Sequence, residues 1–473
     1  MNAIFQYVYL AVFFGMAMAV PLAIATWVMV GSRAASVWVL VYLLPLFCFP
    51  NASWGLIETA AGSNFYTRGT GTFFFSAINL MLFGLAAQAF VMRRFGNLPP
   101  ARHNLKVPAA IFGALMLGNL AVFFAMPNVY WFQLLAPSGL LNVFNLMLAF
   151  YVLTTCFGDD KALDRLVNLL IAVVALRGVW GLVRYVALGG DPANFYSNFQ
   201  HINVKLTFFD INDSFLAATC FFLVVWRLLT DQVRGLGMRS LYVGIALLEL
   251  FIVVFSYRRT GWAGFGLALL LLAFNVNRVQ RAWLLGSYVF AGLPLLIYKL
   301  VQRSATSVAH GGASGGSLLE RAFPDIIQHG SLSFTTGRFA ELYAAFLSVR
   351  ESPLWGLGAW GRYDGFRFSD LAWHQGDFGW MHSGVLHIAL KTGLIGVVAM
   401  LIVMVGAFRF VRRNNARLAP RERGVLLAGA AGLLFMLPNW LFGTPVIEYR
   451  TMQLIALALA LPYCAVAVAD RRG

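Results

Sequence analysis

The chain has 473 residues, of which 60% are hydrophobic and 11% charged, with a mean hydropathy of +0.74. This apolar content excludes a soluble globular domain and predicts an all-α polytopic membrane protein. The formal net charge of +16 would suggest a nucleic-acid partner in a soluble protein. Here the basic residues lie mostly in short loops between apolar runs, and about 20 of the 35 Lys and Arg residues fall in loops expected to be cytoplasmic. This membrane-topology pattern argues for membrane lipids and against nucleic acid.

Apolar runs follow one another along most of the chain, and a bilayer-spanning helix needs roughly 20 such residues. The first 49 residues form a nearly continuous apolar run, so the expected number of transmembrane helices is about 12 or 13. We expect the first of them to be a retained anchor rather than a cleaved signal peptide. The runs lie at 4–30, 35–49, 71–92, 107–126, 138–157, 165–188, 213–230, 240–256, 261–275, 282–300, 382–408, 424–440 and 447–468.

Basic loops alternate with the apolar runs and set the expected orientation. The cytoplasmic loops are 93–106, 227–239, 278–281 and 409–423. By parity the outward segments are 50–70, 127–137, 189–212, 257–260, 301–381 and 441–446. We therefore divide the chain into helices 1–10 over 1–300, a large outward loop over 301–381, and a C-terminal part over 382–473 with a cytoplasmic tail.

The outward loop 301–381 is the one candidate for an extramembrane domain. It begins with a Gly/Ser stretch at 310–317, typical of a flexible hinge, and 339–349 has the spacing of a short amphipathic helix. Four tryptophans are placed for a membrane interface: Trp355, Trp360, Trp373 and Trp380.

His382 stands at the outer end of the helix expected over 382–408. A neutral imidazole can take a proton from a hydroxyl acceptor, whereas the alternative is an interfacial histidine that caps the helix. Ser383, His374 and Asp377 are candidates for the acceptor site. Gly393 and Gly396 would ordinarily permit close helix packing.

Five arginines are candidates for binding an anionic substrate. Arg258 and Arg259 lie in a very short outward turn, and their alternative is to snorkel to the lipid headgroups. Arg177 and Arg184 are seven apart, so they share one helix face about 10 Å from each other. A structural ion pair, for example with Glu249, is the alternative for Arg177. Arg338 has a weaker case because it lies in a loop.

Other polar residues favour structural roles. Lys391 follows His382 by nine residues and so falls on the opposite helix face, where packing or an ion pair is expected. Asp210 and Asp213 share one outward loop, which is a weak metal signal, and a helix N-cap at Asp213 is favoured. The cysteines lie inside apolar segments without metal spacing and are expected as small core residues: Cys48, Cys156, Cys220 and Cys464.

The pattern of His382-Ser383, nine residues, Gly393, two residues and Gly396 resembles the signature of the O-antigen ligase and O-antigen polymerase superfamily. Val397 departs from it, because the pattern usually closes with Gly, Thr or Tyr. Arg259-Thr-Gly resembles the outward arginine of the family, and 337–338 and 352–358 resemble the segments before the histidine. The resemblance covers roughly 250–400.

The resemblance implies a metal-independent, cofactor-free, inverting glycosyltransferase in the bacterial inner membrane, with its active site facing the periplasm. Such enzymes move a saccharide from undecaprenyl diphosphate to an acceptor hydroxyl. The acceptor is a second lipid-linked unit in a polymerase and lipid A–core in a ligase. The chain length favours a polymerase, whose partners would include a chain-length regulator. Independently, arginine forks suit the charge of a departing diphosphate.

Two other classes remain open. A transporter of an anionic solute would explain many helices with buried arginines, but the chain shows no internal repeat. A cell-wall polymerase of the shape, elongation and division type would want an outward catalytic aspartate, whereas the best motif here centres on His382.

Overall fold

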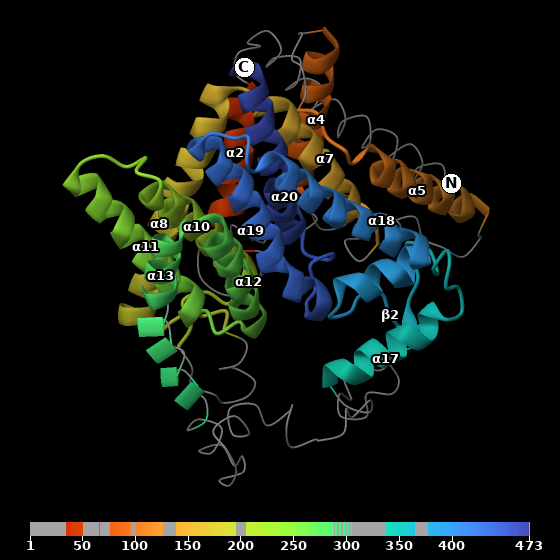
Figure 1. Ribbon diagram of the computed structural model, residues 1–473. Coiled ribbons are helices and arrows are strands. Elements are labelled where there is room, and N and C mark those ends of the chain that lie inside the picture. Colours follow the sequence, from red (N-terminus) through yellow and green to blue (C-terminus); the bar gives the residue numbers. More distant parts are fainter. Residues whose placement is uncertain are drawn as a thin grey trace. The chain divides into compact units, whose positions relative to one another are not determined.

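The computed structural model describes residues 35–50, 66, 76–95, 101–125, 139–194, 205–287, 337–364 and 377–472, with single positions between 289 and 304 (Figure 1). Its helices are α2 Ala35–Cys48, α4 Ala77–Phe95, α5 Lys106–Ala125, α7 Leu141–Cys156, α8 Asp160–Ala187, α10 Ile211–Leu229, α11 Leu236–Phe255, α12 Arg259–Asn275, α13 Arg278–Ser287, α17 Gly337–Val349, α18 Gly384–Asn414, α19 Pro420–Phe442 and α20 Tyr449–Arg472. Two short strands, β1 Tyr363–Asp364 and β2 Asp377–Phe378, pair antiparallel.

Seven of these helices are long and apolar enough to cross a membrane, namely α5, α8, α10, α11, α18, α19 and α20. The helices α2 and α7 are apolar but shorter. They coincide with the apolar runs of the sequence, so the prediction of an all-α polytopic membrane protein is confirmed. The predicted run 4–30 lies outside the described residues, and the total of 12 or 13 helices and the orientation stay predictions.

The described chain forms two compact units, which we describe separately. The first comprises residues 1–174, 395–433 and 445–473 as far as they are described. Here α20 packs against α7 and α2, and α4 packs against α7 and α2. Gly429 permits a close approach of α19 to α20, because a Cβ there would lie 2.5 Å from the carbonyl oxygen of Ala458. Of the most apolar 18-residue stretch of α20, 89% is buried, as expected of a stretch that is apolar on every side.

Ion pairs join three helix ends in this first unit. Arg421 of α19 pairs with Asp160 of α8 at 2.8 Å, and Arg472 of α20 pairs with Glu422 at 2.7 Å. Exposed ion pairs contribute little individually, but Arg421 and Arg472 share the partners Asp160 and the buried Glu422, so the pairs form a network that fixes the helix ends. The ends contributed by α19 and α20 lie in segments predicted to be cytoplasmic.

The second unit comprises residues 175–394 and 434–444 as far as they are described. In it α10 packs against α11 and α12, and α12 packs against α13. A Cβ on Gly264 would overlap the carbonyl group of Phe435, so only glycine allows this approach of α12. All the described candidates for the functional site belong to this unit. The division into 1–300, 301–381 and 382–473 describes how the chain is expected to lie relative to the membrane, and not which residues pack together. It stays a prediction.

Candidate functional site

Three of the predicted arginines gather on one dipeptide, Phe208-Phe209, just before α10. From α8, the guanidinium carbons of Arg177 and Arg184 lie 4.5 and 5.4 Å from the centre of the Phe208 ring. Arg258 lies 4.0 Å from the centre of the Phe209 ring, and its Nε donates to the Phe209 carbonyl oxygen at 2.6 Å. The shared helix face predicted from the spacing of Arg177 and Arg184 is thus what brings both to Phe208.

Arg177 forms a buried, two-point ion pair with Asp213. Its Nε lies 2.6 Å from Oδ1 and its Nη2 3.1 Å from Oδ2, and the two side chains are 9% and 2% exposed. The suggested partner Glu249 was therefore wrong. Glu249 is buried beside Gly178, and its carboxylate oxygens make no hydrogen bond within the described part of the chain. The sequence spacing carried no signal for a partner on another helix.

Arg184 forms a second buried ion pair, with Asp191. The Asp191 carboxylate also accepts from the backbone nitrogens of Phe209 at 2.7 Å and Ala193 at 2.9 Å. Burial raises the pKa of Asp191, while Arg184 and the two backbone donors act in the opposite direction. Asp191 therefore ties the end of α8 to the Phe208-Phe209 segment.

Arg258 differs from these two arginines. It is half-buried, and it forms no ion pair with a carboxylate among the described residues. Its neighbour Tyr257 has a positive φ of 60°, a strained value for a bulky residue, and this turn presents Arg258 to Phe209. Arg259 begins α12 and is exposed. The two arginines of the turn are thus not equivalent.

The acids of the same segment serve the helix and the arginines. Asp210, rather than the predicted Asp213, is the N-cap of α10, and its Oδ1 accepts from the backbone nitrogen of Asn212 at 2.9 Å. Asp213 is one turn further along and binds Arg177. Across the described ranges, no three His, Cys, Asp or Glu side chains are grouped as a metal site would need.

His382 contacts a residue that the sequence did not single out, Glu341 of α17. The His382 ring Nδ1 lies 2.8 Å from Glu341 Oε2, and the His382 backbone nitrogen donates to Glu341 Oε1 at 3.1 Å. The Tyr363 hydroxyl donates to the same Oε1 at 3.2 Å. A signal did exist, because Glu341 shares its helix face with the buried Ala344 and Ala345, where an apolar residue would be expected.

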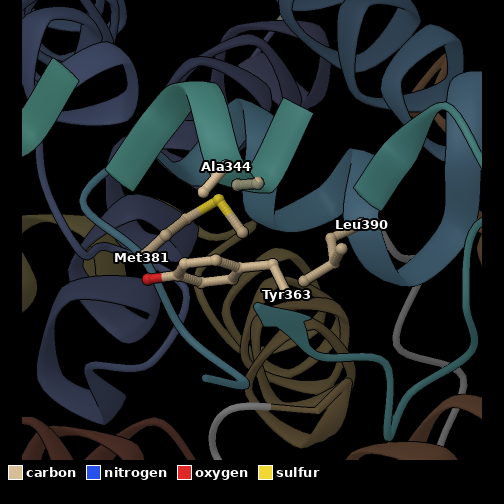
Figure 2. Packing of buried hydrophobic residues seen from close by; sticks show 5 residues of the cluster. Ala344, Tyr363, Met381 and Leu390 are labelled. Atoms are coloured by element: carbon tan, nitrogen blue, oxygen red, sulfur yellow. The ribbon is translucent and has the colours of Figure 1, made fainter. Parts of the chain in front are cut away.

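A small apolar core holds these groups. It comprises Ala344, Ala345, Tyr363, Met381 and Leu390. Figure 2 shows the Met381 side chain beside the Tyr363 ring, with Ala344 of α17 and Leu390 of α18 nearby. The pairing of Tyr363 with Phe378 across β1 and β2 brings the chain back towards His382. Burial raises the pKa of the Tyr363 hydroxyl, as does the neighbouring Glu341.

The motif glycine Gly393 breaks α18 instead of packing two helices. It has a φ of +63°, and a Cβ there would overlap the Leu354 carbonyl. The loop 353–358 fills the break: Leu394 donates to the Pro353 carbonyl at 2.8 Å, and Leu357 donates to the Leu390 carbonyl at 2.7 Å. The expectation of close helix packing is corrected here, because the partner is a loop.

The remaining candidates have varied outcomes. Ser383 is buried, and its Oγ accepts from the Leu386 backbone nitrogen at 3.3 Å, which favours a helix cap over an acceptor site. The buried Lys391 donates to the Gly361 carbonyl, in line with its predicted packing role. His374 lies outside the described residues, as do the side chains of Asp377 and Arg338, whose backbones belong to β2 and α17.

Comparison with known proteins agrees with the motif. A search of curated proteins finds no match to the chain. Residues 244–401 match the family model described as O-antigen ligase. The match includes the arginine turn, Glu341, His382 and Gly393, and it agrees with the resemblance over roughly 250–400. The segment 244–401 is therefore similar to the O-antigen ligase family, in agreement with the resemblance stated from the motif.

Proposed function

We propose that the protein transfers a saccharide from undecaprenyl diphosphate to an acceptor hydroxyl at the periplasmic face of the inner membrane. The observation that carries the proposal is the contact of His382 Nδ1 with the buried Glu341 carboxylate, 2.8 Å away. This contact occupies one ring nitrogen and leaves Nε2 as the basic atom. The His382 side chain is 33% exposed, so a substrate can reach it.

In the proposed reaction His382 acts as the general base. Nε2 takes the proton of the acceptor hydroxyl, and the oxygen electron pair attacks the anomeric carbon of the donor sugar. The bond between that carbon and the phosphate oxygen breaks, and undecaprenyl diphosphate leaves with the bonding electrons. Attack opposite the leaving group inverts the anomeric centre. General-base catalysis of this kind contributes about 10²–10⁴-fold.

The leaving diphosphate needs a cationic partner, and Arg258 fits this role. Its Nε is engaged by the Phe209 carbonyl and its plane lies near the Phe209 ring, so the fork is held in place. Arg177 and Arg184 are neutralised by Asp213 and Asp191, and they contribute chiefly by building the Phe208-Phe209 platform. Arg259 and Arg338 remain additional candidates. Preorganised donors near a water-depleted membrane boundary stabilise developing charge strongly.

Two candidate enzymes share this donor and differ only in the acceptor. A polymerase extends another lipid-linked repeat unit, and a ligase transfers to lipid A–core. Polymerase activity is the first candidate, and ligase activity is the alternative. A transporter is disfavoured because it gives no reason for a histidine held by a buried acid.

The test uses the purified full-length protein in proteoliposomes with an undecaprenyl-diphosphate-linked repeat unit. Polymer formed from this donor alone supports a polymerase. Product formed only after lipid A–core is added supports a ligase. A protein that forms neither product, but accumulates an anionic saccharide inside the vesicles, would refute the proposal in favour of transport.

A further inference from the structure

We infer that Glu341 and Tyr363 are positioning residues, which hold His382 as the tautomer protonated at Nδ1 and free to accept a proton at Nε2. This inference rests on the proposed function and deepens it. It assigns a task to two residues that never need to touch substrate. Their task is to set the orientation of the base and to stabilise it once it carries a proton.

The hydrogen-bond inventory of the Glu341 carboxylate supports this assignment. Oε1 accepts from the His382 backbone nitrogen and from the Tyr363 hydroxyl, and Oε2 faces His382 Nδ1. A backbone nitrogen can only donate, so Oε1 is an acceptor. An ionised carboxylate accepts at both oxygens, so the ring nitrogen facing Oε2 is the donor and carries the proton. The second ring nitrogen of a neutral imidazole is then its acceptor.

The burial of the three groups separates their roles. The Glu341 side chain is 10% exposed and that of His382 33% exposed. Tyr363 is 3% exposed within the apolar core beside Met381 and Leu390. The acid is therefore screened from water and from substrate, while the base is accessible. A buried carboxylate beside the ring also stabilises the imidazolium that forms when His382 takes the acceptor proton.

Two contacts of the His382 residue limit its movement. The backbone nitrogen and the ring nitrogen both bind the same carboxylate, which fixes main chain and side chain together. The Trp380 ring packs edge-on with ring centres 5.4 Å apart. Among the described residues, Glu341 of α17 is the titratable group that contacts the ring. The Tyr363 hydroxyl of β1 reaches the same carboxylate, and Lys391 of α18 donates to the Gly361 carbonyl. The ring orientation therefore depends on Glu341.

The primary test is the pH profile of transfer by Glu341→Gln in the full-length protein. We expect kcat to fall by about 10²–10⁴-fold, because an amide can no longer fix the tautomer, with little change in the KM of the donor. A pH profile that differs from the wild-type profile would show that Glu341 acts through His382 and not only through the fold. Glu351→Gln is the matched control, since Glu351 is exposed just after the same helix, and it should behave as wild type.

A second variant keeps the test decisive if Glu341→Gln does not fold. Tyr363→Phe retains the charge and the core packing but removes one donor to Oε1, so kcat should fall severalfold at unchanged donor KM. Wild-type kcat and an unshifted pH profile in these variants would overturn the inference. An activity loss that only follows the folded fraction, as measured by thermal unfolding, would reduce both residues to a structural role.

The outcome also separates this inference from the proposed function. Wild-type turnover in His382→Ala would refute the histidine mechanism itself. If His382→Ala is inactive while Glu341→Gln and Tyr363→Phe are fully active, the base assignment stands and the positioning role alone falls.

Discussion

Gly356 and Gly393 meet with their backbones in contact, and this contact joins the segment before His382 to the helix behind it. A Cβ on Gly356 would lie 2.5 Å from the Thr392 backbone nitrogen, and both glycines have positive φ values, 73° and 63°. Because Gly393 interrupts α18, the loop 353–358 can bind backbone groups that the break leaves open. The motif glycine thus supports the site that begins at His382.

Gly393→Ala should destabilise the protein and reduce saccharide transfer. The Gly393 backbone, with φ 63° and ψ −162°, lies in a region that is essentially restricted to glycine and costs an alanine about 1–3 kcal/mol, and overlap with the Leu354 carbonyl adds to this cost. Thermal unfolding in detergent and the transfer assay measure the two effects. Gly266→Ala in α12 is the control, because nothing lies within 4 Å of its Cβ position. Equal unfolding temperatures for the two variants would show that the contact contributes little.

His382→Ala should abolish transfer and leave the fold intact. Loss of a general base slows the reaction by about 10²–10⁴-fold, equivalent to roughly 3–5 kcal/mol in the barrier. The side chain is one-third exposed, so its removal leaves no large cavity. Initial rates in proteoliposomes, with folded protein quantified by size-exclusion chromatography, provide the measurement. Transfer at the wild-type rate would show that another group is the base.

Arg258→Lys should impair donor use more than Arg259→Lys does. An ammonium cannot reproduce the contact of the guanidinium with the Phe209 ring together with a bidentate fork for diphosphate, whereas Arg259 is exposed. We expect kcat/KM for the donor to fall by about 10–100-fold in Arg258→Lys, which corresponds to roughly 1.4–2.8 kcal/mol. Titration with undecaprenyl diphosphate should weaken in parallel. The reverse ranking would restore Arg259 as the principal ligand.

A feature of the fold or of the candidate site could be predicted where neighbouring residues in the sequence determine it. Apolar runs are local, and within the described ranges they coincide with the helices that are long enough to cross a membrane. The orientation drawn from the basic loops stays a prediction. The shared face of Arg177 and Arg184 follows from helix geometry alone. The partners Asp213 and Glu341 were missed because such contacts join separate elements, and no periodicity relates their positions. The motif singles out Gly393, but its role in the structure depends on the loop 353–358, which packs against the break in α18.

The Arg177–Asp213 pair allows a structural role to be separated from a role in binding. Asp213→Ala removes the carboxylate partner of a buried guanidinium and should destabilise the protein by about 3–5 kcal/mol. The double variant Arg177→Met with Asp213→Leu removes both charges, so it should recover most of that stability. Denaturant unfolding and the transfer assay are compared for both. Recovered stability with full activity would exclude Arg177 as a substrate ligand, whereas recovered stability without activity would retain it.

Chelation should leave turnover nearly unchanged. Mg²⁺ and Mn²⁺ prefer several oxygen ligands, and the two acids of the 210–213 segment are already engaged. Asp213 binds both nitrogens of the Arg177 fork, and Asp210 caps α10 through Asn212. Freeing either acid for a metal would break a buried contact. The transfer rate is therefore measured with EDTA and then with excess Mg²⁺ or Mn²⁺. Activity that is lost in EDTA and restored by either ion would make these acids metal ligands and transfer the stabilisation of the diphosphate from Arg258 to the metal.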